Sequence, residues 1–151
     1  MTIQEALDIV DEMKPNMMSR KMKIKYLTQI EQLIFSEIVN KHYDGNRPPI
    51  NPYNEHTDPL EIPPEEDIPQ PPEPRSMPRY TEQTDDGTEL IIPDPYAMVY
   101  VYWLMTKIDM QNQEDARYNI DRAHFENAYE TMSDWYTREH MPVQRTREFR
   151  L

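Results

Sequence analysis

Apolar side chains recur every three to four residues over two N-terminal stretches, which is the spacing of one face of an α-helix. The first predicted helix covers residues 2–13 and opens with Thr2 and Glu5 at the spacing of a capping box. The second covers about 20–40 and follows Ser19, a residue type that caps helices well. The N-terminal part of the chain is therefore predicted to fold as two helices.

The most apolar stretch of the chain is residues 94–108, DPYAMVYVYWLMTKI. Asp94 can cap a helix, and Pro95 suits the first helical position. The two opposite faces are Tyr96, Tyr100 and Trp103 on one side and Met98, Val101, Met105 and Ile108 on the other. A helix that is apolar all round must be covered all round. We expect the aliphatic face to lie in the core and the aromatic face to lie nearer a neighbouring subunit.

A last helix is predicted from about Gln113 to Glu139, with Asn112 as its cap and Pro142 beyond its end. Its main apolar stripe is Tyr118, Phe125, Tyr129, Met132 and Tyr136. Because the link to the preceding helix is short, the two helices are expected to pack antiparallel.

A β-hairpin is predicted between the N-terminal and C-terminal helices. Residues 80–84 and 88–92 have the composition of short strands, and they flank Asp85, Asp86 and Gly87. Asp-Gly is a strong signal for a tight turn. The acidic residues of this turn do not have the spacing of an EF-hand loop, so no calcium site is predicted.

Residues 44–78, the acidic arm, differ from the rest in composition. They hold eleven of the fifteen prolines and eight carboxylates, but only two arginines. Such a composition favours extended polyproline conformation. We expect an arm that lies along a neighbouring subunit, the alternative being a solvated loop.

These elements predict a mainly α fold: a single-domain, four-helix subunit with one β-hairpin and a long proline-rich acidic arm. The predicted parts are two N-terminal helices (1–43), the acidic arm (44–78), the β-hairpin (79–93), a helical hairpin (94–142) and a C-terminal tail (143–151), within one domain of residues 1–151.

The formal net charge of −12 argues against sequence-independent DNA binding, which needs cations facing phosphates. It suits a basic partner or, in another class, a mimic of DNA. The lysines of the second helix, Lys21, Lys23, Lys25 and Lys41, are interpreted as a solvated face. The N-terminus does not resemble a signal peptide, and no apolar run reaches membrane-spanning length. An intracellular protein without membrane contact is expected.

No catalytic, cofactor or metal constellation is predicted. The chain has no cysteine, its two glycines cannot build a phosphate-binding loop, and its four histidines are widely separated. One carboxylate stands out, because Glu31 falls within the apolar face of the second helix, between Leu27 and Ile34. A buried carboxylate must be paired or protonated. We expect a structural pairing with an arginine or a tyrosine hydroxyl rather than a general base.

Four motifs occur in a characteristic order: ALDIVDEMKPNMMS, KIKYLTQIEQLIFSEI, LIIPDPYAMVYVYWLMTKID and RYNIDRAHFENAYETMSDWYTREHMP. Together they resemble the head–tail connector (adaptor) proteins of tailed bacteriophages. The resemblance covers residues 3–42 and 88–142, and the acidic arm looks like an insertion or an enlarged loop relative to that family, so the resemblance implies no role for it. It implies a small helical protein without enzymatic activity. It also implies assembly as a ring, commonly twelve-fold, between the portal and the tail proteins in the neck of a virion, after assembly in the host cytoplasm.

Under this hypothesis, genomic DNA passes through the channel with at most non-specific contacts. The residues expected in subunit or partner contacts are Tyr96, Tyr100 and Trp103 laterally, and Arg145, Arg147 and Arg150 toward the portal or a neighbour. Two other classes stay open: an acidic DNA mimic that inhibits a host DNA-binding enzyme, and a small monomeric protein-binding module.

Overall fold

The structure is a computed structural model that describes residues 1–42 and 76–140. Its described part is mainly helical, as predicted, and no strand forms there. The helical elements are α1 (Ile3–Met13), α2 (Arg20–Ile34), a π-helical turn η1 (Phe35–Val39), a 3₁₀ turn η2 (Asn40–His42), α3 (Met98–Asn112) and α4 (Asp115–Glu139). The acidic arm up to residue 75, and the tail with Arg145, Arg147 and Arg150, lie outside the described residues.

Both predicted N-terminal caps form. Thr2 and Glu5 make the reciprocal capping box of α1, since the Thr2 hydroxyl accepts from the Glu5 backbone and the Glu5 carboxylate accepts from the Thr2 backbone. Ser19 caps α2 by accepting from the backbone N–H of Met22. Helical structure then continues through η1 and η2 to His42, close to the predicted end.

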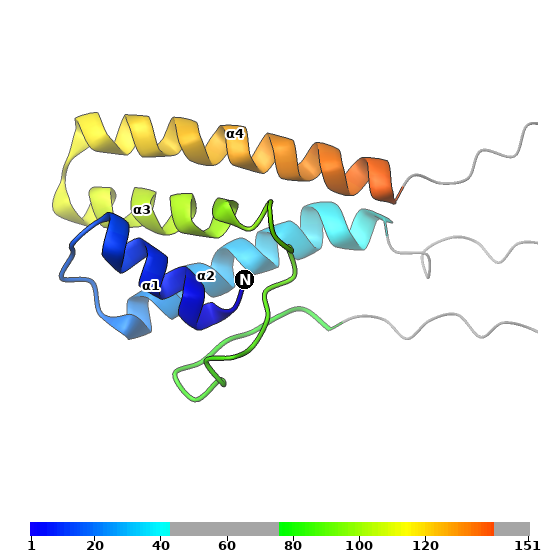
Figure 1. Ribbon diagram of the computed structural model, residues 1–151, viewed down its shortest axis with the longest axis horizontal. Helices are drawn as coiled ribbons and strands as arrows, with labels where there is room; N and C mark the ends of the chain where they lie inside the picture. Colours follow the sequence, from blue (N-terminus) through cyan, green and yellow to red (C-terminus); the bar gives the residue numbers. More distant parts are fainter. Residues whose placement is uncertain (43–75, 141–151) are drawn as a thin grey trace, which may run out of the picture.

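Helix α3 lies between α4 on one side and α1 and α2 on the other (Figure 1). Eight of its fifteen residues are buried: Val99, Tyr100, Val101, Leu104, Met105, Thr106, Ile108 and Asp109. The helix begins at Met98, so the predicted start at Asp94 and Pro95 is wrong. Residues 93–97 form a turn instead, in which the Tyr96 N–H donates to the Pro93 carbonyl. The chain itself thus covers most of the apolar helix.

Helices α3 and α4 form the predicted antiparallel hairpin (Figure 1). Gln113 ends α3 in the left-handed conformation, with φ of 58°, and donates its backbone N–H to the last turn. α4 therefore begins at Asp115, two residues later than predicted, with Glu114 at the N-cap position. Along its 25 residues only Asp121, Met132 and Tyr136 are buried, so one narrow stripe of α4 covers α3.

The predicted β-hairpin over residues 79–93 is not confirmed. Turns form at 81–84 and 85–88, but residues 88–90 bond with the N-terminus rather than with residues 80–84. The Ile3 N–H donates to the Thr88 carbonyl, and the Leu90 N–H donates to the Met1 carbonyl. The backbone groups that a hairpin partner would use are thus occupied by the entrance to α1.

We predict that Leu104→Ala lowers the free energy of unfolding by about 2–5 kcal/mol, because Leu104 is fully buried and truncation leaves a cavity. Ile120→Ala is the matched control on α4, since Ile120 is 58% exposed, and its effect should stay within about 0.5 kcal/mol. Denaturant unfolding of both variants tests this; equal effects would contradict the placement of α3 at the centre.

Candidate functional site

A buried carboxylate holds the irregular segment 79–92 against the helices. Glu31 of α2 is fully buried and accepts three hydrogen bonds. The Tyr80 hydroxyl donates to Oε2 at 3.0 Å, while the Ile91 N–H, at 2.9 Å, and the Tyr100 hydroxyl donate to Oε1. The Tyr100 hydroxyl in turn accepts from the Ile92 N–H at 3.1 Å. One side chain thereby joins α2, α3 and both ends of the segment.

Burial makes the charged form of Glu31 less favourable than it is in water. Burial raises the pKa of the Glu31 carboxyl above its usual value, although the three donated bonds act in the opposite direction. Burial and the nearby Glu31 charge also raise the pKa of both tyrosine hydroxyls. All three donors are neutral, and no cation among the described residues pairs with the carboxylate. The sequence-based expectation of a tyrosine hydroxyl partner is confirmed, whereas no arginine of residues 1–42 and 76–140 bonds to Glu31.

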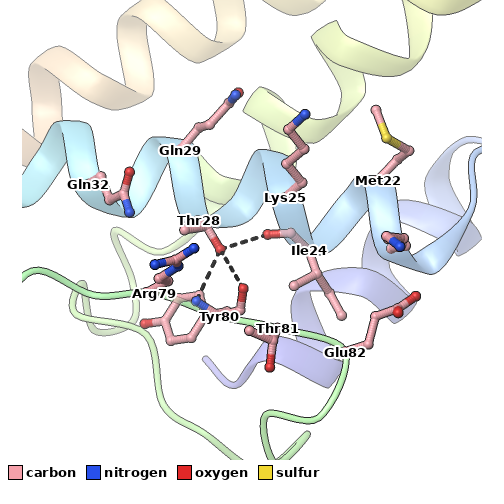
Figure 2. Close-up of a pocket in the computed structure, with 11 residues that line it drawn as sticks. Met22, Ile24, Lys25, Thr28, Gln29, Gln32, Arg79, Tyr80, Thr81 and Glu82 are labelled. Atoms are coloured by element: carbon pink, nitrogen blue, oxygen red, sulfur yellow. Dashed lines mark hydrogen bonds between the residues drawn. The ribbon is translucent and has the colours of Figure 1, made fainter.

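A groove of about 550 Å³ runs along the outer side of α2. Figure 2 shows its lining residues, which come from α2 on one side and from residues 79–82 on the other. Lys21 and Lys25 line it from α2, and Arg79 and Glu82 line it from the segment. Apolar parts of the lining come from Met22, Ile24 and Tyr80. The lining thus carries three cationic side chains, Lys21, Lys25 and Arg79, and one carboxylate, Glu82.

Two hydrogen-bonded contacts fix the groove's walls relative to each other. The Thr28 hydroxyl accepts from the Tyr80 N–H at 3.3 Å, as Figure 2 shows, and Gln32 Nε2 donates to the Pro78 carbonyl at 3.1 Å. Tyr80 is also held from behind by Glu31. The groove is therefore built into the fold.

The four lysines interpreted as a solvated face separate in the structure. Lys23 is buried and forms an ion pair with Asp11 of α1, so that interpretation is wrong for Lys23. Lys21 and Lys25 are exposed and line the groove. Lys41 is exposed in η2, away from it.

A second buried charge cluster ties α1 to the α3–α4 hairpin. Lys14, the C-cap of α1, forms ion pairs with Asp109 of α3 and Asp121 of α4. The two carboxylates raise the pKa of the Lys14 ammonium even though burial opposes its charge, while burial raises the pKa of Asp109. Asp109 Oδ2 is buried without a hydrogen-bond partner among the described residues. The apolar periodicity could not reveal this cluster, because its members come from three helices.

Tyr100, predicted as a lateral contact, is corrected by its position: it is fully buried and bonded to Glu31, so no other subunit can reach it. Tyr96 and Trp103 are half-buried against α4, where Tyr96 stacks on Trp135 with ring centroids 4.6 Å apart. Trp103 lies 5.1 Å from Phe125 between ring centroids. Each of these two rings therefore packs partly against α4 and is partly exposed at the surface.

Three exposed apolar side chains, which the sequence did not single out, are Met13 at the end of α1, Met17 in the α1–α2 loop and Ile120 in the first turns of α4; we call them the end patch. Figure 1 shows the α1–α2 loop and the α3–α4 turn at the same end of the molecule. Met13 and Ile120 line one shallow cavity of about 320 Å³ there, with Pro15 beside them. Met13 is 49% exposed and Met17, in the same loop, 97%. Methionine side chains adapt to varied surfaces, which makes this end patch a candidate protein contact.

Within residues 1–42 and 76–140, no group of three or more His, Asp or Glu side chains is placed to hold a metal ion. No helix in the same part of the chain is long and apolar enough to cross a membrane. Comparison of the chain with protein-family models, curated proteins and solved structures gives no match.

We predict that Glu31→Ala costs about 3–5 kcal/mol of stability, because it leaves several buried donors without an acceptor. Glu31→Gln is the control: its amide oxygen can accept from Tyr100 and Ile91, and its amide nitrogen can donate to the Tyr80 oxygen. Denaturant unfolding gives the energies, and hydrogen exchange of residues 79–92 should accelerate in Glu31→Ala only.

Comparison of the wild type with Glu31→Gln also tests the raised pKa of Glu31. The folded state binds this proton more tightly than the unfolded state, whose carboxyl has its ordinary pKa of 4.5. The contribution of Glu31 to stability is therefore full below pH 4.5 and is lost as the pH rises through the folded pKa. Glu31→Gln should lack this part of the pH dependence; identical pH profiles for wild type and variant would contradict it.

We predict that Lys14→Met destabilises the fold by about 3–5 kcal/mol at neutral pH, because it leaves buried Asp109 without its cation. The loss of stability should become smaller toward pH 4, because the unpaired carboxylates can then be neutralised by protons while the protein stays folded. Urea unfolding at both pH values measures this. Arg122→Met, which breaks an exposed ion pair with Glu126, is the control and should leave the free energy of unfolding nearly unchanged at either pH.

Proposed function

We propose that this chain is a structural subunit of a phage head–tail connector, a non-enzymatic adaptor that assembles as a ring between portal and tail. The observation that carries the proposal is the ordered resemblance of residues 3–42 and 88–142 to that family. The described parts of both stretches belong to one core, which includes Leu27 from the first stretch and Leu104 from the second. The segments that resemble an adaptor therefore fold as one unit.

The surface of the subunit supports a role in assembly. The end patch around Met13, Met17 and Ile120 exposes apolar area that a neighbour or a stacked protein can cover. Ring formation requires two complementary faces on each copy. Because Tyr100 is buried, it is no longer a candidate contact. The candidate contacts are now the end patch and the exposed parts of Tyr96 and Trp103.

Net negative charge suits the inside of such a ring. A carboxylate-rich wall repels the phosphates of passing DNA and lets the duplex slide, whereas a basic wall would hold it. The proposed location is the neck of the virion, after assembly in the host cytoplasm, with the portal and the neck or tail proteins as partners.

One observation favours a second candidate, a monomeric protein-binding module. The apolar helix α3 is covered for the most part by its own chain, so its burial does not depend on another copy. The DNA-mimic alternative has no such support. The exposed side of α4 intersperses Arg117 and Arg122 with its carboxylates, in ion pairs with Glu114 and Glu126, and so lacks the uniform charge of a row of phosphates.

The test is assembly in solution, alone and with the portal protein of the same phage, measured by light scattering and negative-stain microscopy. Rings, or stacking that depends on portal, are expected. A protein that stays monomeric, ignores portal and binds another protein partner indicates the binding module. Competition with DNA for a host enzyme instead indicates the mimic.

We predict that Ile120→Asp keeps the melting temperature of the monomer within a few degrees, because Ile120 is 58% exposed, yet reduces ring formation or portal stacking at least tenfold. Asn127→Asp, which adds the same charge at another exposed position of α4, is the control and should assemble normally. Normal assembly of both variants would remove the end patch from the contact surface.

A further inference from the structure

The groove along α2 contains cations that the described part of the subunit leaves unpaired. Lys21, Lys25 and Arg79 line it, and none of them has an ion-pair partner within residues 1–42 and 76–140. Glu82 is the single acidic residue of the lining. Elsewhere in the described residues, five cations form ion pairs with carboxylates: Lys14, Arg20, Lys23, Arg117 and Arg122. Lys41, Lys107 and Arg138 have no carboxylate partner within residues 1–42 and 76–140, but none of these three lines the groove. In a chain of net charge −12, three unpaired cations in one groove require a physical explanation.

The groove has the features of a site for an extended peptide. The apolar atoms of Met22, Ile24 and Tyr80 offer surface for proline and aliphatic side chains, with the cations beside them. A volume of about 550 Å³ lies within the usual range of binding pockets. Because Tyr80 is held by Glu31 and Thr28, binding would not have to order the groove first.

A nucleic acid fits this groove less well than an acidic peptide does. Three cations with Glu82 among them give little net charge for a phosphate backbone, and the whole chain repels polyanions. Tyr80 is the only aromatic residue of the lining, so no platform for stacked bases exists. Short carboxylate runs, each pairing with one or two cations, match the groove better.

The chain itself contains a segment of the required chemistry. Residues 61–67, EIPPEED, place the apolar residues Ile62, Pro63 and Pro64 directly before three consecutive carboxylates. Consecutive prolines favour the extended polyproline conformation, which lowers the entropic cost of binding. We propose that the groove along α2 binds residues 61–67 of a second copy of this chain. This inference rests on the proposed ring assembly, in which each subunit would hold its neighbour's acidic arm.

The position of the groove explains why the donor is a second copy. Residues 79–82 form one wall, and the Pro78 carbonyl is bonded to Gln32 at the groove's end, so the acidic segment of the same chain would have to turn back to enter. In the sequence, the acidic segment 61–67 is followed by residues 68–74, IPQPPEP, which contain four prolines and no glycine, before the chain reaches the groove wall. A sequence rich in proline and without glycine disfavours the tight reversal that binding to its own groove would need, so we assign the segment to the groove of a second copy.

The absence of cysteine makes a direct cross-linking test clean. Gln29→Cys, in the groove, and Gln70→Cys, in the acidic arm just beyond the proposed bound segment, are made in separate full-length chains and mixed under mild oxidation. We expect a disulfide-linked heterodimer, lost when the groove chain also carries Lys21→Glu and Lys25→Glu and retained with Lys41→Glu as the control. If one chain with both cysteines forms only an intrachain disulfide, the segment binds its own groove and the second-copy proposal fails.

A binding measurement adds a second readout. A fluorescent peptide of residues 59–70 is titrated into a full-length chain whose own arm carries Glu65→Lys and Glu66→Lys. Lys21→Glu with Lys25→Glu should weaken binding about tenfold at low salt, equivalent to about 1.4 kcal/mol, and added salt should reduce the difference. Lys41→Glu should change it less than about twofold. Equal affinities for all three chains would overturn the groove assignment.

The outcomes separate this inference from the proposed function. Portal-dependent rings of the wild type without any cross-link or peptide binding would keep the adaptor and reject the groove's role. Specific cross-links between copies, with no ring and no response to portal, would keep the groove's role and reject the adaptor.

Discussion

Three neutral donors converge on one buried carboxylate, and the irregular part of the fold depends on that convergence. Glu31 lies in the apolar face of α2, where a charged carboxylate would be strongly unfavourable without hydrogen bonds donated to its oxygens. The Tyr80 hydroxyl and the Ile91 N–H come from the segment between the two helical halves, and the Tyr100 hydroxyl comes from α3. A segment with no strand pairing of its own thereby gains a defined position. That position also creates one wall of the basic groove.

The other buried charges work as connections between helices. Lys14 at the end of α1 joins Asp109 and Asp121 of the α3–α4 hairpin, and Lys23 joins α2 to Asp11 of α1. Breaking such a pair is costly, because the remaining charge stays buried. The four helices are thus held together by apolar packing around α3 and by ion pairs at its end. The helices are thereby fixed relative to one another, and their exposed side chains keep defined positions for contacts with other proteins.

The proposed adaptor role and the proposed arm–groove contact assign different tasks to different parts of the chain. The helical body supplies rigid faces, such as the end patch with Ile120, for stacking and lateral contact. The acidic arm, with eight carboxylates, would then tie neighbours together through the cations that line the groove. Electrostatic pairing of this kind weakens with salt and favours the correct orientation of neighbours over high affinity. It is compatible with subunits that assemble on a portal.

Local patterns in the sequence determined the helices, the Thr2–Glu5 capping box, the Ser19 cap and the antiparallel α3–α4 pairing, because caps and apolar spacing act over a few residues. The same patterns showed that Glu31 needs a partner. Only the tertiary structure decided that Tyr100, 69 residues away, is one of the partners of Glu31, which moves Tyr100 from the expected subunit contact to the core. It likewise decided that residues 88–90 pair with residues 1–3 and not with a hairpin strand. Burial and backbone pairing depend on segments remote along the chain, so local periodicity cannot choose among competing partners.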